Sequence, residues 1–431
     1  MSNKIKLERY FYPVGQGLCC REQFILEDGR KFNLVYDCGG SSYTSGRCFE
    51  LKKSNYGKKS ERYPYPCVRE FIKKELNGVI INALYISHLH DDHINILPFL
   101  ESVCKVDNII LPYFSPKDIV YNLLDPKIEN NEITMSLLGN AGNFKVPIVA
   151  SRFINDSERS FEIFKNSKIY LILPEEHGHT TDFNTRGDNN FISSGTDLLS
   201  RIGFPEISNI WQYLPYNYNK PQDATDAFIN ETLKDFEQVF TDLSAFIEYR
   251  ETIKHKYGQI ISSKGGMRRS SVNYRGRYFN EQSTVLFSLP KDDILNSASF
   301  YDIICQRTHY LGYCSECKIC ITDKVRQKRK GDCKPGCVYL GDYLSKPQYL
   351  YDNLKPKLVT HKSKIHTLQV AHHGSQNGVL VDDFYNENIC VISYGETNSY
   401  GHPHKKLEKA INNAERVDVT ESKEYIQRYD L

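Results

Sequence analysis

The sequence has little net charge and no long apolar run, and each absence excludes a class of protein. The 431 residues carry a formal charge of +2, so the chain lacks the overall basic character of a general nucleic-acid binder. No stretch approaches the ~20 consecutive apolar residues of a membrane-spanning helix. Residues 1–6 show no apolar signal-peptide core. We therefore expect a cytoplasmic protein that has no membrane partner.

The chain has 13 cysteines, although a reducing cytoplasm disfavours disulfides. Two pairs of closely spaced cysteines, one in the pattern Cys-x-x-Cys and one in Cys-x-x-x-Cys, provide the four thiolates of a tetrahedral structural zinc site. The four expected zinc ligands are Cys314, Cys317, Cys333 and Cys337. Cys305 and Cys320 are alternative ligands, and the run through Cys320 leaves an iron–sulfur centre open as a second interpretation. The basic tip Lys324–Lys330 could clamp a polyanion.

One short stretch, Ser87–His93, holds three imidazoles and two carboxylates. The apolar run before it, Val79–Ile86, predicts a buried strand, and the apolar residues after it begin a helix. In extended backbone His88 and His90 point to the same side, while Asp92 and His93 follow where the chain begins to coil. Imidazole and carboxylate suit zinc, manganese or iron. Four ligands in this order predict two adjacent metal ions.

The pattern His-x-His-x-Asp-His after an apolar strand resembles the signature of the metallo-β-lactamase fold. Further stretches are similar to the hydrolase domain of ComEC-type competence proteins, and similar domains occur in phosphorylcholine esterases. These stretches are Val14–Gly17, Tyr36–Gly39, Leu340–Asp342, Ala371–Ser375 and Tyr400–His404. The resemblance covers about residues 1–174 and 280–420. The chain departs from the family at Leu18, where the family usually has an acidic residue.

The resemblance implies an α/β fold, a four-layer αββα metallo-β-lactamase-like sandwich. Residues 1–174 and 280–431 are its two halves, and residues 175–279 are a helix-rich insertion. The segment 221–257 has apolar residues spaced by three and four, which predicts an amphipathic helix. The apolar side of this helix would pack on the core of the protein. Alternatively, it would form the interface of a homodimer or of a complex with a protein partner. A small Cys-rich zinc-binding insertion interrupts the second half at about 305–337.

The resemblance also implies the roles of the site residues. The expected metal ligands are His88, His90, Asp92, His93, Asp342 and His402, and the expected catalytic residues are Asp92, His372 and His373. One ion is assigned to His88 and His90, the other to Asp92, His93 and His402, with Asp342 bridging them. The family match selects His402, since spacing alone does not choose between His402 and His404.

Some details of the site stay open at this point. His372 and His373 lie beside the metals, where one ligates and the other binds a phosphoryl oxygen or protonates the leaving group. Asp37 is expected to hold the metal loop through structural hydrogen bonds. A third histidine for the first ion would be His177, His179 or His309, or water completes the site.

These assignments predict a hydrolase with two divalent ions, zinc or manganese, besides the structural zinc. A bridging hydroxide would cleave a phosphodiester substrate, with DNA or RNA favoured by the basic segments. One alternative is a small-molecule hydrolase acting on a cyclic nucleotide, a phosphocholine ester or a lactone, since a fold does not determine a substrate. Another is a non-catalytic binding module in which zinc is structural. The resemblance adds the expectation of an effector in bacterial defence.

Overall fold

The structure is a computed structural model, and all structural statements concern the residues that it describes. These are residues 5–40, 68–113, 164, 166–175, 190–218, 283–291, 299–308, 320–327, 334–345, 348–378, 380, 383–386, 388–396, 398, 401–421 and 423–431. Several predicted features lie outside them: the 221–257 helix, His177, His179, His309, Cys314, Cys317, Cys333 and residues 328–330 of the basic tip.

The described strands form a large mixed sheet of sixteen strands and a separate two-stranded sheet. In spatial order, the first half of the large sheet contains β13 (Cys320–Gln327), β12 (Ser299–Thr308), β18 (Lys423–Asp430), β1 (Lys6–Phe11), β2 (Cys19–Ile25), β3 (Lys31–Cys38), β5 (Ala83–Tyr85), β7 (Asn108–Pro112) and β8 (Lys168–Glu175), with β9 (Phe191–Ser193) beside β8. The strands are antiparallel from β13 to β3 and parallel from β3 to β8.

The second half of the sheet continues from β8 through a parallel pairing with β10. In order it contains β10 (Trp211–Tyr218), β11 (Val285–Pro290), β14 (Gly336–Tyr339), β15 (Ile365–Gln369), β16 (Ile389–Ser393) and β17 (Glu415–Val419). The pairs β10–β11 and β11–β14 are antiparallel, and β14 to β17 are parallel. The two-stranded sheet pairs β4 (Ile80–Ile81) with β6 (Lys105–Val106).

The described helices are short. They are α1 (Val68–Leu76), α2 (Asp91–Ile94), α3 (Leu97–Val103), α6 (Leu198–Ile202), α7 (Pro205–Ser208), α11 (Gln348–His361) and α12 (Lys405–Ala410), with the 3₁₀ turns η5 (Ala371–Gly374) and η6 (Asp383–Tyr385). Among them, none has the length and apolar character needed to cross a membrane.

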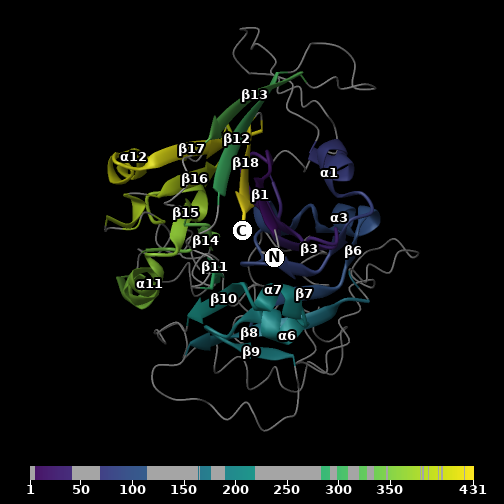
Figure 1. Cartoon of the computed structure of the whole chain (residues 1–431). Coiled ribbons are helices and arrows are strands. Elements are labelled where there is room, and N and C mark those ends of the chain that lie inside the picture. Colours follow the sequence, from purple (N-terminus) through teal and green to yellow (C-terminus); the bar gives the residue numbers. More distant parts are fainter. Residues whose placement is uncertain are drawn as a thin grey trace, which may run out of the picture.

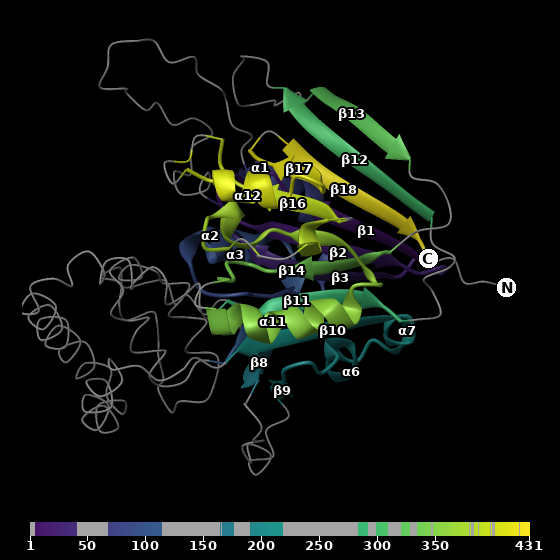
Figure 2. The same cartoon turned by 90° about the vertical axis from the view of Figure 1, so that its left-hand side faces the viewer.

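Three apolar cores define the layers of the molecule. The two halves of the sheet pack against each other, because one core draws residues from both, and the Tyr36 and Tyr339 rings stack across it at 4.8 Å. A second core lies between the outer face of the first half and α1, α2 and α3. A third lies between the second half and the helices α11 and α12. Figures 1 and 2 show these two helix groups on opposite outer sides.

The alternation of side chains along each strand produces these cores. In β3, Leu34 and Tyr36 face the core between the sheet halves, while Val35 faces the helices. In β16, Val391 faces the inner core and Ile392 the helices. Because successive residues of a strand point to opposite faces, a strand buried on both sides is apolar throughout. Within the apolar run Val79–Ile86 this character holds for β5, which is buried throughout, whereas β4 belongs to the two-stranded sheet and exposes Ile80.

Residues 190–218 differ from the expected helix-rich insertion. They include α6 and α7, but also β9 and the eight-residue strand β10. Because β10 pairs with both β8 and β11, this part of the segment 175–279 joins the two halves of the sheet. The alternation in β10 is masked by aromatic residues on both faces, so its sequence lacks a clear strand pattern.

Cys337 has a different place from the one predicted for a zinc ligand. It lies in β14, fully buried in the core between the sheet halves. Burial raises the pKa of its thiol to about 12. Cys337 is therefore a buried thiol of the core, where the sequence pattern predicted a zinc ligand.

A buried polar network connects the two halves of the sheet. Arg9 donates from Nε to Glu22 Oε1 at 2.6 Å, and both side chains are fully buried. Glu22 also accepts hydrogen bonds from groups of the second half, the hydroxyls of Tyr213 (2.7 Å), Ser288 (2.6 Å) and Tyr339 (2.8 Å). A buried carboxylate is tolerated only when charge and hydrogen bonds compensate its lost hydration.

We expect Glu22→Ala to destabilise the protein strongly, because Arg9 and three hydroxyls lose their common partner. Removing one member of a buried ion pair typically lowers the free energy of unfolding by about 3–5 kcal/mol. The measurement is urea unfolding followed by fluorescence of the single tryptophan, Trp211, which is buried beside this network. The control is Arg30→Ala, which removes two exposed ion pairs, with Asp28 and Glu206, and should leave the midpoint nearly unchanged. Equal effects of the two variants would contradict the role of the network.

Candidate metal centre

The candidate site lies where strands of both sheet halves end. His88 and His90 follow β5, and Asp92 and His93 lie in α2 directly after them. Asp342 follows β14, and the pair His372–His373 follows β15. The strand β5 is parallel to its neighbours, as β14 is to β15, so their carboxyl ends gather at one edge.

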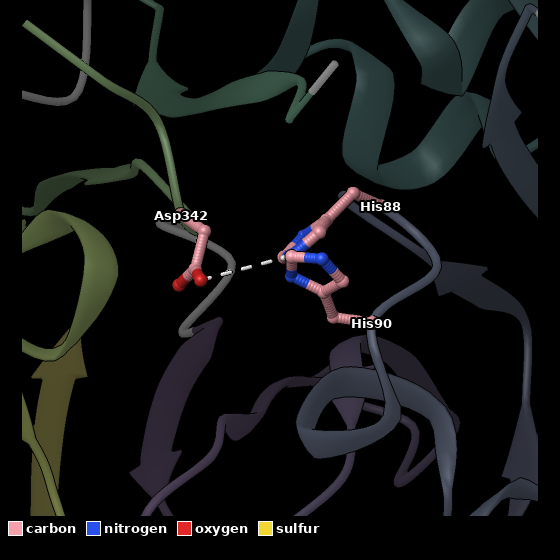
Figure 3. Close-up of side chains that lie close together, drawn as sticks. All are labelled: His88, His90 and Asp342. Atoms are coloured by element: carbon pink, nitrogen blue, oxygen red, sulfur yellow. Dashed lines mark hydrogen bonds and ion pairs between the residues drawn. The ribbon is translucent and has the colours of Figure 1, made fainter. Parts of the chain in front are cut away.

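The first group of candidate ligands is His88, His90 and Asp342 (Figure 3). His88 Nε2 lies 3.0 Å from His90 Nδ1 and 3.8 Å from Asp342 Oδ2. Their ligand atoms all lie within 4.8 Å of one another, close enough to bind one ion. His88 and Asp342 are buried, and His90 is partly exposed.

The second group of candidate ligands is Asp92, His93 and His373. His373 Nε2 lies 3.3 Å from Asp92 Oδ2, and it is a buried nitrogen that makes no well-aligned hydrogen bond. The other oxygen of Asp342, Oδ1, lies 3.1 Å from His93 Nε2 and 3.6 Å from His373 Nε2. Each oxygen of Asp342 therefore faces a different group, as the predicted bridging role requires.

The histidines are oriented by partners behind them. Asp37 accepts from Ser87 N and Ser87 Oγ, both at 2.7 Å, and from His93 Nδ1 at 2.8 Å. Ser87 Oγ, whose proton points to Asp37, lies 3.0 Å from His88 Nδ1. His373 Nδ1 donates to the carbonyl of Ser393 at 2.9 Å. In each of these three histidines Nδ1 is engaged and Nε2 faces the site, the arrangement in which outer partners orient metal-binding imidazoles.

Two glycines allow the loops to meet at this site. A Cβ at Gly39 would lie 2.4 Å from the carbonyl carbon of Asp92, and one at Gly17 would lie 2.6 Å from the Asp92 oxygen. Leu18 N also donates to that carbonyl oxygen at 3.2 Å. The stretches Val14–Gly17 and Tyr36–Gly39 thus support the backbone of the metal loop, and only glycine permits this close approach.

The ionisable side chains of the site stabilise one another's charged forms: burial opposes the charged forms of His93 and His373, but Asp342 raises the pKa of both. Burial alone would raise the pKa of Asp342, but the surrounding histidines His372, His93 and His373 hold it well below its ordinary value. Burial also opposes ionisation of Asp92, whose pKa is nevertheless lowered by the adjacent imidazole of His373 and by the charge of His93. Burial lowers the pKa of His88 well below its ordinary value, which favours the neutral imidazole that a metal requires.

The residues present therefore fit two divalent ions. Two ionised carboxylates and four imidazoles, those of His88, His90, His93 and His373, surround one small volume. Imidazole nitrogen and carboxylate oxygen are suitable donors for zinc or manganese. Metal binding itself stays a prediction.

The second group contains His373 and lacks the predicted ligand His402. His402 is not part of either group among the described residues, and its ring centre lies 5.6 Å from that of His372. His373 joins Asp92 and His93 in the second group, because the bond from its Nδ1 to Ser393 directs Nε2 toward Asp92 and Asp342; ligation by His402 stays a prediction. The sequence signal for this was the pair His372–His373 directly after a buried strand, but it did not distinguish the two histidines.

Comparison with protein-family models finds none that matches the chain, and no curated protein matches it either. Support for a function therefore comes from the residues of the site.

We expect His373→Ala to lose binding of one manganese ion and His402→Ala to keep both. Even partners outside the ligand set typically change metal affinity by about 10–100-fold, so loss of a ligand should cost at least this much. Calorimetric titration with Mn²⁺ measures both sites with little interference from the cysteines, which favour softer metals. Circular dichroism of both variants controls for folding. Loss of an ion in His402→Ala, with both ions retained in His373→Ala, would reverse the assignment.

Proposed function

We propose that the protein is a metal-dependent hydrolase that cleaves phosphodiester bonds of nucleic acid. The observation that carries this proposal is the position of Asp342, whose two oxygens face two separate groups of ligands. Two-metal phosphoesterases hold their ions roughly 3.5–4 Å apart, a distance that one carboxylate can bridge. The negative charge between the groups would keep both cations close together.

We propose further that the layers form the αββα sandwich of the metallo-β-lactamase fold. The order of layers supports this: α1–α3, the first half of the sheet, the second half, and α11 with α12. The site lies at the edge where strands of both halves end. The motifs Val14–Gly17, Tyr36–Gly39 and Leu340–Asp342 all contribute residues at or next to it.

Two ions held there would supply a hydroxide nucleophile at neutral pH and neutralise charge on the phosphoryl oxygens. The chain itself orients the centre, since Asp37 aligns His93 directly and His88 through Ser87. Asp92 and His373, predicted as catalytic residues, serve in this proposal as ligands of the second ion. His372 remains beside the centre, with Nε2 3.7 Å from Asp342 Oδ2, where a substrate group can reach it.

Nucleic acid is the proposed substrate because of the basic tip. Its first part, Lys324 and Arg326, lies in β13, the edge strand that pairs with β12.

We also propose that the Cys-rich segment binds one structural zinc ion. Since Cys337 is buried in the core, Cys320, which begins β13 next to residues 309–319, is the better placed fourth ligand by chain position.

We expect Asp92→Ala to reduce cleavage of DNA or RNA by the manganese-loaded protein at least about 10²-fold, the scale of losing one group that stabilises the transition state. Fluorescently labelled oligonucleotides and bis(4-nitrophenyl) phosphate serve as substrates. Asp28→Ala, an exposed residue in the turn between β2 and β3, is the matched control and should keep full activity.

Unchanged nucleic-acid cleavage by Asp92→Ala would contradict the proposal. The salt dependence of substrate binding distinguishes substrate classes: affinity for a polyanion falls steeply with salt concentration, whereas affinity for a small ester does not. A flat dependence would exclude nucleic acid and leave a small phosphodiester as substrate.

A further inference from the structure

The described side chains of the candidate metal centre differ in exposure. The side chains of His88 and His93 are fully buried, and those of Asp342 and His373 are 3% exposed. In contrast, the side chain of Asp92 is 31% exposed and that of His372 is 23% exposed. A substrate that reaches the centre contacts exposed side chains, and His372 is among these.

The backbone places His372 there at an energetic cost. His372 and His373 both have positive φ, 50° and 52°, a region that residues other than glycine rarely adopt. The turn is maintained by hydrogen bonds from His372 N to Gly341 O (2.8 Å) and from Ser375 N to His372 O (2.8 Å). Unfavourable backbone conformations of this kind persist where the surrounding structure enforces them, commonly at functional sites. Here the turn directs one imidazole into the ligand group and leaves the other beside it.

His402 is held next to His372 by its own loop. Asn398 accepts from His402 N at 3.1 Å and donates from Nδ2 to His402 O (2.9 Å) and Gly395 O (2.6 Å). On the other side, His404 N donates to Gly374 O at 2.9 Å, which connects this loop to the His372 turn. The two ring centres are 5.6 Å apart, a spacing at which both imidazoles can reach one tetrahedral anion.

We propose that His372 and His402 form a phosphoryl-binding subsite beside the metal centre, an inference that rests on the proposed function. Each imidazole donates one N–H to a non-bridging oxygen of the phosphoryl group that lies over Asp342. Neither ring belongs to the two ligand groups found among the described residues, and backbone hydrogen bonds hold both. His372 lies 3.7 Å from the bridging carboxylate, and His402 lies beside His372. Asn398 is a positioning residue for this subsite.

The test uses the full chain loaded with Mn²⁺ and inorganic phosphate as the probe. His372→Ala and His402→Ala are each expected to bind manganese as the wild type does, but to bind phosphate about 10-fold more weakly, the scale of one hydrogen bond to a charged group. The double variant should lose less phosphate affinity than the product of the two single fold-losses, because both imidazoles bind the same anion. His404→Ser is the control, because serine retains the N-cap of α12.

The same variants are then assayed with a phosphodiester, where kcat/KM should fall and metal stoichiometry should not. Three results would overturn the subsite: loss of a manganese ion in either variant, phosphate affinity equal to that of the control in both, or no phosphate binding by the loaded wild type. If the wild type cleaves no phosphodiester but its phosphate affinity depends on both histidines, the subsite stands and the proposed function fails.

Discussion

The candidate centre depends on the two halves of the sheet staying stacked, because the carboxylate between its ligand groups belongs to the second half. Asp342 follows β14, whereas His88, His90 and His93 follow β5 in the first half. A small sliding of one half would separate Oδ1 from His93, now 3.1 Å away. The Arg9–Glu22 network and the stacked rings of Tyr36 and Tyr339 resist such sliding, since they connect the same two halves. The geometry of the centre and the stability of the fold thus share one interlayer core.

Much of the centre could be predicted from the sequence because its signals are local. The apolar run before Ser87–His93 specifies a buried strand, and the spacing of His88 and His90 places them together whatever the distant partners are. The mixed α/β class also follows from local patterns, since buried strands and amphipathic helices differ in period. Asp37 and the glycines of its stretch were recognisable, and the structure shows what they contact, the loop of Ser87 and the Asp92 backbone.

The remainder could not be predicted because it depends on packing between distant segments. The sequence did not show which of His372 and His373 is a ligand, since the deciding contact, from His373 to the Ser393 carbonyl, joins the turn after β15 to β16. Cys337 has the spacing expected of a zinc ligand, but its side chain is buried in the core between the two halves of the sheet. The sequence pattern places β10 within an insertion, because aromatic residues on both of its faces conceal the alternation of a strand. Contacts between distant segments thus determine the roles of His373 and Cys337.

The most direct test of the central claim is anomalous X-ray diffraction from crystals grown with Mn²⁺, recorded above and below the manganese absorption edge. The account predicts two peaks on either side of Asp342, one among His88 and His90 and the other among Asp92, His93 and His373. His372 and His402 should lie near neither peak at ligand distance. No peak at this edge of the sheet, or a single peak bound by His402, would contradict the dinuclear centre on which the proposed function rests.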